Sequence, residues 1–249
     1  HKGKSIDYYE ANNWYLLADE QGHAGAQNNL GANYSIGNGV QQNYKQAVYW
    51  YQKAAKQGLA RAQYNLALKY NFGQGIQQSF KQAVYWYQKG AEQGDVNAQL
   101  NLGVMYNNGQ GVQQSLKQAI YWFKKAAGQG DPSAQANLGI MYAAGQGGQQ
   151  NQKQAVYWFQ MSAGQGHADA QARLAIIYFE GKNVDQDYKK GASWFRKAAS
   201  QGHAEAQHVL GLLYEKGIGI NQDYQQAVIW YRKAAAQGHK GAIEALKAM

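Results

Sequence analysis

Histidine is the residue of this sequence best suited to metal or acid–base chemistry, because the chain has no cysteine and six histidines. Four of them, His23, His167, His203 and His239, occupy one position of a 36-residue period. Neighbours in such a row are expected about 10 Å apart, whereas metal ligands lie within about 2.0–2.2 Å of one ion. His203 and His208 are close in sequence, but no third ligand accompanies them. The sequence therefore predicts exposed histidines at helix starts, with no metal or cofactor site.

Motifs for other kinds of catalysis do not stand out either. No serine is placed with a histidine and an acid in a nucleophile motif, and no glycine-rich loop follows a strand pattern to hold phosphate. The recurring Gly-x-Gly turns, such as the one at Gly37 and Gly39, follow helical patterns and are interpreted as helix breaks. We therefore expect a protein that is not an enzyme.

Composition and charge leave several classes of partner open. The chain has 249 residues and a formal net charge of +9, so acidic partners must be considered. No apolar run approaches the roughly 20 residues that span a bilayer. Without cysteines the redox compartment cannot be inferred, and localisation stays open. Residues 1–6 match the pattern only loosely and are interpreted as a leader or a cloning remnant.

The period of 36 residues organises the whole chain. All seven tryptophans follow it: Trp14, Trp50, Trp86, Trp122, Trp158, Trp194 and Trp230. A leucine series keeps the same step: Leu30, Leu66, Leu102, Leu138, Leu174, Leu210 and Leu246. A fixed period of this length indicates stacked repeats, each packing only on its neighbours. We therefore expect one elongated, all-α domain over residues 7–249.

Each period contains the signals of two helices. A capping pair such as Asn43 and Gln46 starts one helix, which runs from about 44 to 57 and ends at Gly58. The other helix follows at once, and small residues such as Gly31 and Gly103 allow close packing on it. Residues 7–22 then form a half repeat, residues 23–238 six helix pairs, and residues 239–249 a second half repeat. The tryptophans are expected to be largely buried, Trp122 among them.

The repeated motifs resemble a known family. The pattern Ala-Gln-x-Asn-Leu-Gly-x-x-Tyr, then Gly-x-Gly-Val, then Ala-x-x-Trp-Tyr-x-Lys-Ala-Ala-x-Gln-Gly is similar to the Sel-one-like repeat, a relative of the tetratricopeptide repeat. The resemblance implies a right-handed α/α superhelical solenoid, with the first helix of each pair on the concave side. It also implies a scaffold or adaptor that binds proteins, in the bacterial periplasm or secreted, with the cytoplasm as the alternative. We expect a monomer.

The candidate ligand-binding residues lie on the first helices. Positions that vary between copies can serve a ligand that differs along its length, and an asparagine row lies beside them. The resemblance implies that these positions face a groove, where asparagine bonds the backbone of an extended peptide. The alternative, that the asparagines join adjacent repeats, is equally compatible with the sequence. The expected groove residues are Asn29, Asn65, Asn101, Asn137, Arg173, Arg61, Tyr64, Leu68, Val104, Ile140 and Ile176.

A second surface supports the alternative function. On a helical wheel Tyr49 lies opposite the buried Tyr51, and a lysine row runs beside it. Basic charge with interleaved aromatics is typical of a surface for nucleic acid or anionic glycan, although lysine stems on a solvated face give the same pattern. This alternative surface comprises Lys45, Tyr49, Lys81, Tyr85, Lys117 and Tyr121. A protein partner is favoured, and nucleic acid is not expected.

The fifth copy departs from the pattern and is expected to be the loosest. Gly148 replaces the apolar loop residue found at Val40, and Asn183 stands where the second loop glycine is expected. Gly191 replaces a helix alanine, at a cost of about 1 kcal/mol.

Overall fold

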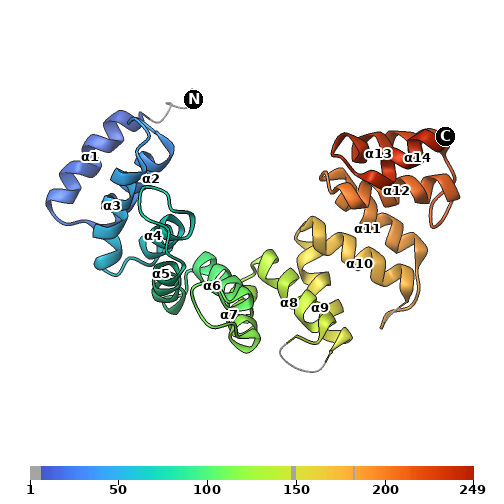
Figure 1. Ribbon diagram of the computed structural model, residues 1–249, viewed down its shortest axis with the longest axis horizontal. Helices are drawn as coiled ribbons and strands as arrows, with labels where there is room; N and C mark the ends of the chain where they lie inside the picture. The colour runs from blue at the N-terminus through green and yellow to red at the C-terminus, as the bar shows by residue number, and fades with distance from the viewer. Residues whose placement is uncertain (1–6, 147–149, 182) are drawn as a thin grey trace, which may run out of the picture. The chain divides into compact units, whose positions relative to one another are not determined.

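The computed structural model describes residues 7–146, 150–181 and 183–249, so the expectations for residues 1–6 and for Gly148 lie outside the described residues. The described part forms fourteen α-helices and no strand (Figure 1). The helices are α1 (Tyr8–Glu20), α2 (Ala24–Ile36), α3 (Tyr44–Lys56), α4 (Ala60–Phe72), α5 (Phe80–Glu92), α6 (Val96–Asn108), α7 (Leu116–Gly128), α8 (Pro132–Ala144), α9 (Gln152–Gly164), α10 (Ala168–Glu180), α11 (Tyr188–Ser200), α12 (Ala204–Lys216), α13 (Tyr224–Ala236) and α14 (Lys240–Ala248). None of them is long and apolar enough to span a membrane.

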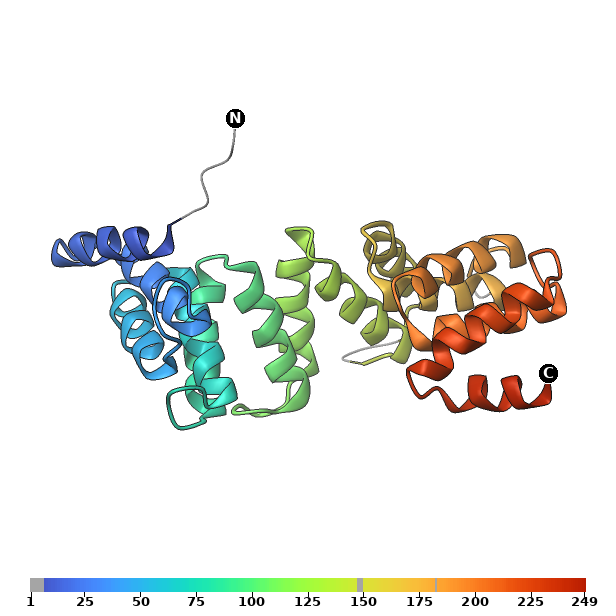
Figure 2. The ribbon, with the colours of Figure 1, turned by 90° about the horizontal axis from the view of Figure 1, so that it is seen from above.

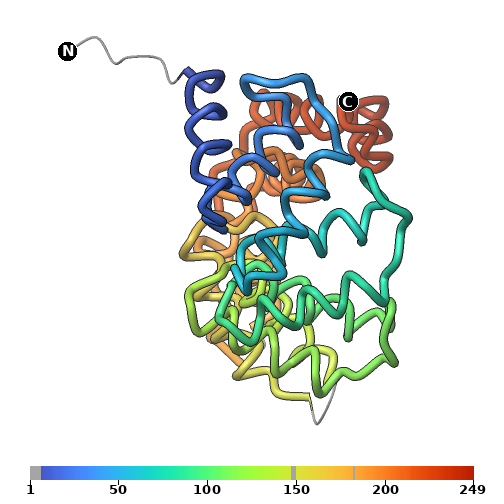
Figure 3. Tube along the Cα trace, turned by 90° about the vertical axis from the view of Figure 1, so that its left-hand side faces the viewer, coloured from blue at the N-terminus to red at the C-terminus, as the bar shows by residue number. Residues whose placement is uncertain are grey.

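The chain divides into two compact units, residues 1–126 and 127–249. Within the first unit, each helix from α1 to α5 packs on the next helix in sequence, and within the second unit each helix from α8 to α13 does the same. Figure 2 shows the helices of each unit running back against one another, and Figure 3 follows the short loops that join them. This consecutive packing of helix pairs confirms the all-α solenoid class. How many domains the chain forms stays a prediction.

The second helix of each repeat begins at the expected cap, but the capping box is only half formed. The side chain of Asn43 accepts from the backbone amides of Lys45 and Gln46 at 3.0 and 3.1 Å, as predicted. The second bond of a full capping box, in which the cap amide donates to the glutamine side chain, is not formed at these caps. That amide instead donates to a tyrosine carbonyl in the preceding helix, as Asn43 N does to Tyr34 O at 2.8 Å. The same bond starts α5, α7, α9, α11 and α13. The third helical residue is therefore free to vary, which explains Lys190 in the fifth copy.

The core consists of the predicted leucine row, alanines and aromatic rings. Leu30, Leu66, Leu102, Leu138, Leu174 and Leu210 are at most 1% exposed. Trp122 is 8% exposed, which confirms its predicted burial, whereas Trp14 on α1 is 63% exposed. A Cβ added at Gly103 would lie 2.6 Å from Cε1 of Phe123. The close approach predicted at the small residues is therefore confirmed, with an aromatic ring as the partner.

A ladder of glutamines joins neighbouring repeats, and its role was not predicted from the sequence. In the second unit, the side chain of Gln201 donates to that of Gln171 at 2.8 Å, and Gln171 in turn donates to the Ala163 carbonyl at 3.1 Å. Within the described residues, the same pair of bonds also joins Gln93 to Gln63 to Ala55, Gln165 to Gln135 to Ala127, and Gln237 to Gln207 to Ala199. The side-chain bond also joins Gln57 to Gln27. Each inner glutamine is at most 5% exposed. Each of these carbonyls also accepts from a backbone amide, as Ala163 O does from Gly166 N at 3.0 Å, so the ladder chiefly satisfies the polar groups of the buried glutamine side chains.

The fifth copy is adapted at Gly191 rather than merely weakened. Asn183 has a φ of 60°, the left-handed turn that glycine adopts more easily, as expected. Gly191 is different, because a Cβ there would overlap the ring of Phe179. The Phe179 ring packs against Tyr188 and Phe195, with centroids 5.4 and 5.7 Å away. An aromatic ring thus fills the place of the alanine methyl group, and the expected looseness of the fifth copy stays a prediction.

Candidate functional site

The second unit carries a groove along the exposed faces of two first helices, α10 and α12. His167 and His203 cap these helices through Nδ1, which accepts from the amides of Ala170 and Ala206 at 3.4 and 3.1 Å. The caps fix where each helix starts. Residues three and four apart then share one face, and this places Arg173, Ile176 and Val209 beside the groove.

Two adjoining cavities make up this groove. The first, of about 410 Å³, is lined at its polar end by charged and imidazole side chains. The second, of about 500 Å³, is mostly apolar. Both share Ile176, Phe195 and Val209, so together they form one cleft, defined here as the α10–α12 groove. The polar end adds Asp169, Arg173, His203 and Glu205. The mostly apolar end adds Phe179, Leu212, Leu213 and Ile218, together with the polar side chains of Glu180, Tyr188 and Lys216. Such a cleft suits a ligand with one charged and one apolar end.

Arg173 is an exposed cation at the polar end of this groove. Its side chain is exposed, and its guanidinium carbon lies 6.0 Å from the ring centroid of Phe159. The nearby Asp169 is instead paired with His203, with Oδ1 and Nε2 3.1 Å apart. Among the described residues Arg173 has no ion-pair partner within 4.0 Å. A guanidinium in this state can bind a ligand carboxylate through two parallel hydrogen bonds.

Arg61, the other predicted carboxylate-binding residue, is already engaged. Its Nε lies 3.2 Å from Oδ2 of Asp95, which caps the next first helix. The same positions are linked one repeat apart in the second unit, by Asp169 with His203 and by Glu205 with His239 at 2.8 Å. These pairs connect successive first helices, and the acidic residue is at the cap in the first unit and on the preceding first helix in the second unit. Arg61 therefore has a structural partner that its sequence position did not reveal.

The asparagine row does not make one uniform set of bonds. Asn65 donates to the side chain of Asn28 in the neighbouring repeat at 2.9 Å, which joins the repeats in that copy. Asn101 donates to the carbonyl of Asn97 in its own helix at 2.8 Å. Asn29 is exposed, and Asn137 is half-buried. Binding of a peptide backbone by this row stays a prediction.

The other predicted groove residues are mostly apolar side chains on the first helices. Leu68, Val104 and Ile140 are half-buried, and Ile176 is 45% exposed. Tyr64 is half-buried beneath Arg61, whose guanidinium carbon is 5.8 Å from the ring centroid. Within the second unit, the structure brings Arg173 and Ile176 together in a cavity.

The alternative surface on the second helices is exposed as expected. Tyr49, Tyr85 and Tyr121 are 50%, 50% and 47% exposed. Each packs edge-on against the next tryptophan in sequence, with centroids 4.9–5.0 Å apart. The cations over these rings are Lys53, Lys89 and Lys125, at 5.7–5.9 Å, and not the row of Lys45, Lys81 and Lys117. The expected row of lysines is exposed, but it does not contact the tyrosines.

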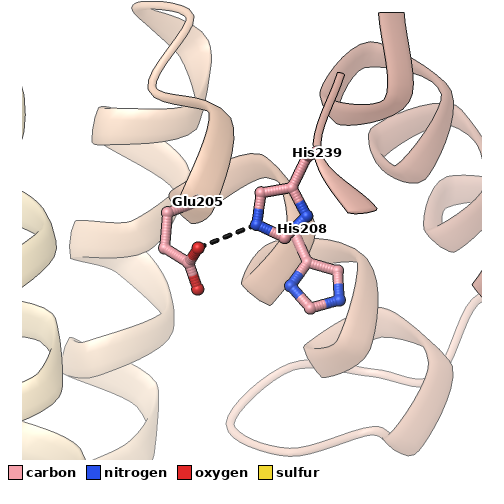
Figure 4. Close-up of side chains that lie close together, drawn as sticks. All are labelled: Glu205, His208 and His239. Carbon is pink, nitrogen blue, oxygen red and sulfur yellow. Dashed lines mark hydrogen bonds and ion pairs between the residues drawn. The ribbon is translucent and has the colours of Figure 1, made fainter. Parts of the chain in front are cut away.

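A histidine cluster that the spacing argument missed lies at the end of the second unit. One oxygen of Glu205 and one nitrogen each of His208 and His239 lie within 4.8 Å of one another (Figure 4). The two rings stack with centroids 4.4 Å apart. His208 lies within helix α12 rather than at a cap, so its ring reaches the cap of the next first helix. Burial, and secondarily His239, lower the pKa of His208.

Comparison with known proteins decides the family. The Sel1 repeat model matches residues 2–23, 24–59, 60–95, 96–131, 132–167, 168–203 and 204–239. The chain belongs to the Sel1 repeat family. Sel1 repeats generally form scaffolds for protein–protein interactions and are typically not catalytic, in agreement with the predicted class of function. No protein with a curated description matched the chain.

Several solved Sel1 structures are similar to this chain. A protective antigen of uropathogenic Escherichia coli with the same fold is 37% identical over 93% of this chain and 50% of its own, with a TM-score of 0.89. A Sel1 repeat protein of Oxalobacter formigenes is 38% identical over 98% and 70%, with a TM-score of 0.88. An immunity protein of Pseudomonas aeruginosa, 22% identical over 88% and 82% with a TM-score of 0.55, shares the fold. The chain spans about half the length of the E. coli antigen.

Proposed function

We propose that this Sel1 repeat protein is a non-enzymatic scaffold that binds an extended protein segment in the α10–α12 groove. The observation that carries the proposal is the cleft itself, because an exposed and unpaired Arg173 lies at one end of a continuous apolar floor. The segment that fits has apolar side chains over Ile176 and Val209 and a carboxylate at Arg173. Burial of the apolar side chains supplies most of the affinity, and the carboxylate sets the direction of the segment.

The charges of the groove restrict the segment further. Asp169 and Glu205 lie at the same end as Arg173, but both are directed to the histidines that cap the following helices. A basic residue would meet Arg173 first, whereas a single carboxylate can approach it without displacing an ion pair. We therefore infer an acidic residue at one end of the segment and aliphatic residues beyond it.

The test uses synthetic peptides of about nine residues, the length expected for a strand that advances roughly 3.3 Å per residue across adjacent repeats. Aliphatic peptides carrying a carboxylate at one end are compared with the same peptides carrying lysine there, by fluorescence anisotropy. Arg173→Asn should weaken the acidic peptide about tenfold, since a charged hydrogen bond is lost. Ile176→Asp should weaken both peptides, because it places a charge in the apolar floor.

Matched controls come from the repeats themselves. Asparagine stands at the Arg173 position in earlier copies, so Arg173→Asn should preserve the fold. Lys189→Gln removes one positive charge from an exposed site on α11 and should leave peptide binding unchanged. Equal binding of acidic and basic peptides, or equal loss with Lys189→Gln, would refute the groove.

The polyanion function is kept as the second candidate because Tyr49, Tyr85 and Tyr121 are half exposed and have cations above their rings. Single-stranded DNA and heparin serve as probes at two salt concentrations. Binding through phosphate or sulfate should weaken steeply as salt rises, and Tyr85→Ala with Lys89→Gln should weaken it further. Salt-resistant peptide binding together with no binding of either polyanion would exclude this candidate.

A further inference from the structure

We propose that Glu205, His208 and His239 form a binding site for a divalent transition metal that joins α12 to the start of α14. The three side chains supply one carboxylate oxygen and two imidazole nitrogens within 4.8 Å of one another. Figure 4 shows the three side chains close together, with the contact between Glu205 and His239 drawn as a dashed line. Two histidines and a carboxylate are a ligand set that zinc accepts, with a fourth position left for water or another group.

This combination occurs at one place in the chain because two positions differ there. The residue at the His208 position is Asn28, Tyr64, Leu100, Ala136 or Ala172 in the other copies. The facing residue on the next first helix is Gly241, where the other copies have larger side chains from Arg61 onward. A Cβ at Gly241 would lie 3.1 Å from Nε2 and from Cε1 of His208. Gly241 therefore provides the space in which the His208 ring lies.

The polar atoms of the cluster are not all satisfied without a ligand. Nδ1 of His208 is buried and has no hydrogen-bond partner among the described residues. Nε2 of His239 contacts Oε2 of Glu205 at 2.8 Å. The cluster thus contains an unpaired buried nitrogen next to a carboxylate that is 62% exposed and open to an entering ion. An orphaned buried nitrogen of this kind requires an explanation, and a metal ion supplies one.

Metal binding requires two local changes. Ligand atoms around a tetrahedral zinc lie about 3.3 Å apart, given zinc–nitrogen bonds of about 2.0–2.1 Å, so the stacked rings must rotate toward one another. Nδ1 of His239 now accepts from the amide of Ala242 at 3.2 Å. When Nε2 binds the metal, the proton of the neutral ring moves to Nδ1, and this cap bond is broken. The Ala242 amide is therefore a reporter of coordination through His239.

The ligand set also predicts which ions bind. Imidazole nitrogen suits zinc, nickel and copper, whereas calcium and magnesium prefer sites made of oxygen ligands. A metal that binds the folded chain and not the unfolded one raises the melting temperature by mass action. Zinc should therefore stabilise the pairing of α12 with α14, and magnesium at the same concentration should not.

The experiment titrates zinc into the chain by calorimetry, in a His1→Ala background because a terminal histidine chelates metal by itself. His208→Ala uses the residue found at Ala136 and Ala172, and Glu205→Ser the residue found at Ser133, so both should fold. The expected result is one zinc per chain, with affinity reduced about tenfold or more in each variant. The amide resonance of Ala242 should shift on zinc addition in the parent and not in His208→Ala.

His167→Ala is the matched control. His167 caps α10 as His239 caps α14, but the residue that corresponds to His208 on the preceding first helix is Ala136. The zinc affinity of this variant should equal that of the parent. Either of two results would overturn the proposal. One is the absence of zinc binding by the folded parent, and the other is equal affinity in the parent, His208→Ala and Glu205→Ser.

Discussion

Lys69 shows how one repeat position can hold residues of opposite character. Its side chain is 7% exposed, and Nζ donates to Oγ of Ser35 at 2.6 Å and to Oε1 of Gln74 at 2.9 Å. Tyr44 lies beneath it, with its ring centroid 4.6 Å from Nζ. Methionine occupies the same position one and two repeats further along, as Met105 and Met141, both nearly fully buried. The lysine is thus held by neutral partners, and burial lowers its pKa.

We expect Lys69→Met to stabilise the chain at pH 7 by about 1 kcal/mol or more, because a buried ammonium loses its hydration. The folded pKa lies below the unfolded one, so the folded state binds its proton less tightly. Wild-type stability therefore rises as the pH passes through the lowered pKa toward 10.5, and the advantage of methionine shrinks there. Urea unfolding of both proteins at pH 7 and pH 10 measures this. A less stable Lys69→Met would show that the hydrogen bonds outweigh desolvation.

At the scale of the helix pair, the fifth repeat offers a test of compensation. Gly191 on α11 faces the Phe179 ring from α10. Adding a methyl group to a filled space costs about 1–3 kcal/mol, whereas glycine to alanine in an open helix gains about 1 kcal/mol. We expect Gly191→Ala to destabilise the chain, and to stabilise it in a Phe179→Ala background. A double-mutant cycle of urea unfolding measures the coupling, and additive effects would refute the compensation.

Helix positions were predictable from the sequence because caps and glycine stops are local signals. The signals at Asn43 and Gly58 predicted a helix from about 44 to 57, and the observed α3 ends one residue earlier, at Lys56. The second bond of the capping box was wrong because the competing carbonyl, on Tyr34, belongs to another helix. The role of Gly191 was missed for the same reason, since Phe179 is twelve residues away in sequence.

The candidate site was predictable only in part. Arg173 and Ile176 were found because variable positions on a repeated helix face are visible in the sequence. The engagement of Arg61 by Asp95 was not, since it depends on how far one first helix lies from the next. The meeting of His208 with His239 depends in addition on the space left by Gly241. Such distances between repeats are set by core packing, which the period alone does not report.

Over the molecule as a whole, buried neutral hydrogen bonds connect the repeats, whereas the ion pairs that also join them are partly exposed. The glutamine ladder is buried, whereas the Lys53–Asp19 and Lys190–Asp187 pairs are partly exposed and contribute little. With a net charge of +9, the excess lysine and arginine side chains repel one another. We therefore expect the melting temperature to rise slightly, and not to fall, from low salt to about 0.5 M sodium chloride, where screening acts over only a few ångströms. Calorimetry measures this.

The matched control for the salt effect lowers the net charge at exposed sites. Lys45→Gln with Lys117→Gln removes two charges from the outer faces of α3 and α7 without touching the ladder. Its melting temperature should depend less on salt than that of the parent. A melting temperature that falls steeply with salt in both proteins would mean that ion pairs hold the repeats together.

The glutamine ladder also bears on how fast the chain folds. Each glutamine pair joins residues 30 positions apart, for example Gln171 and Gln201. Bringing such residues together closes only a short loop, so little chain entropy is lost before the bond and its surrounding core form. Proteins dominated by contacts of this kind fold rapidly, and repeat chains can nucleate at any well-packed pair and extend from there. Because the pairs recur along the chain, several sites can begin folding before synthesis is complete, and each new repeat then adds to a structure already formed.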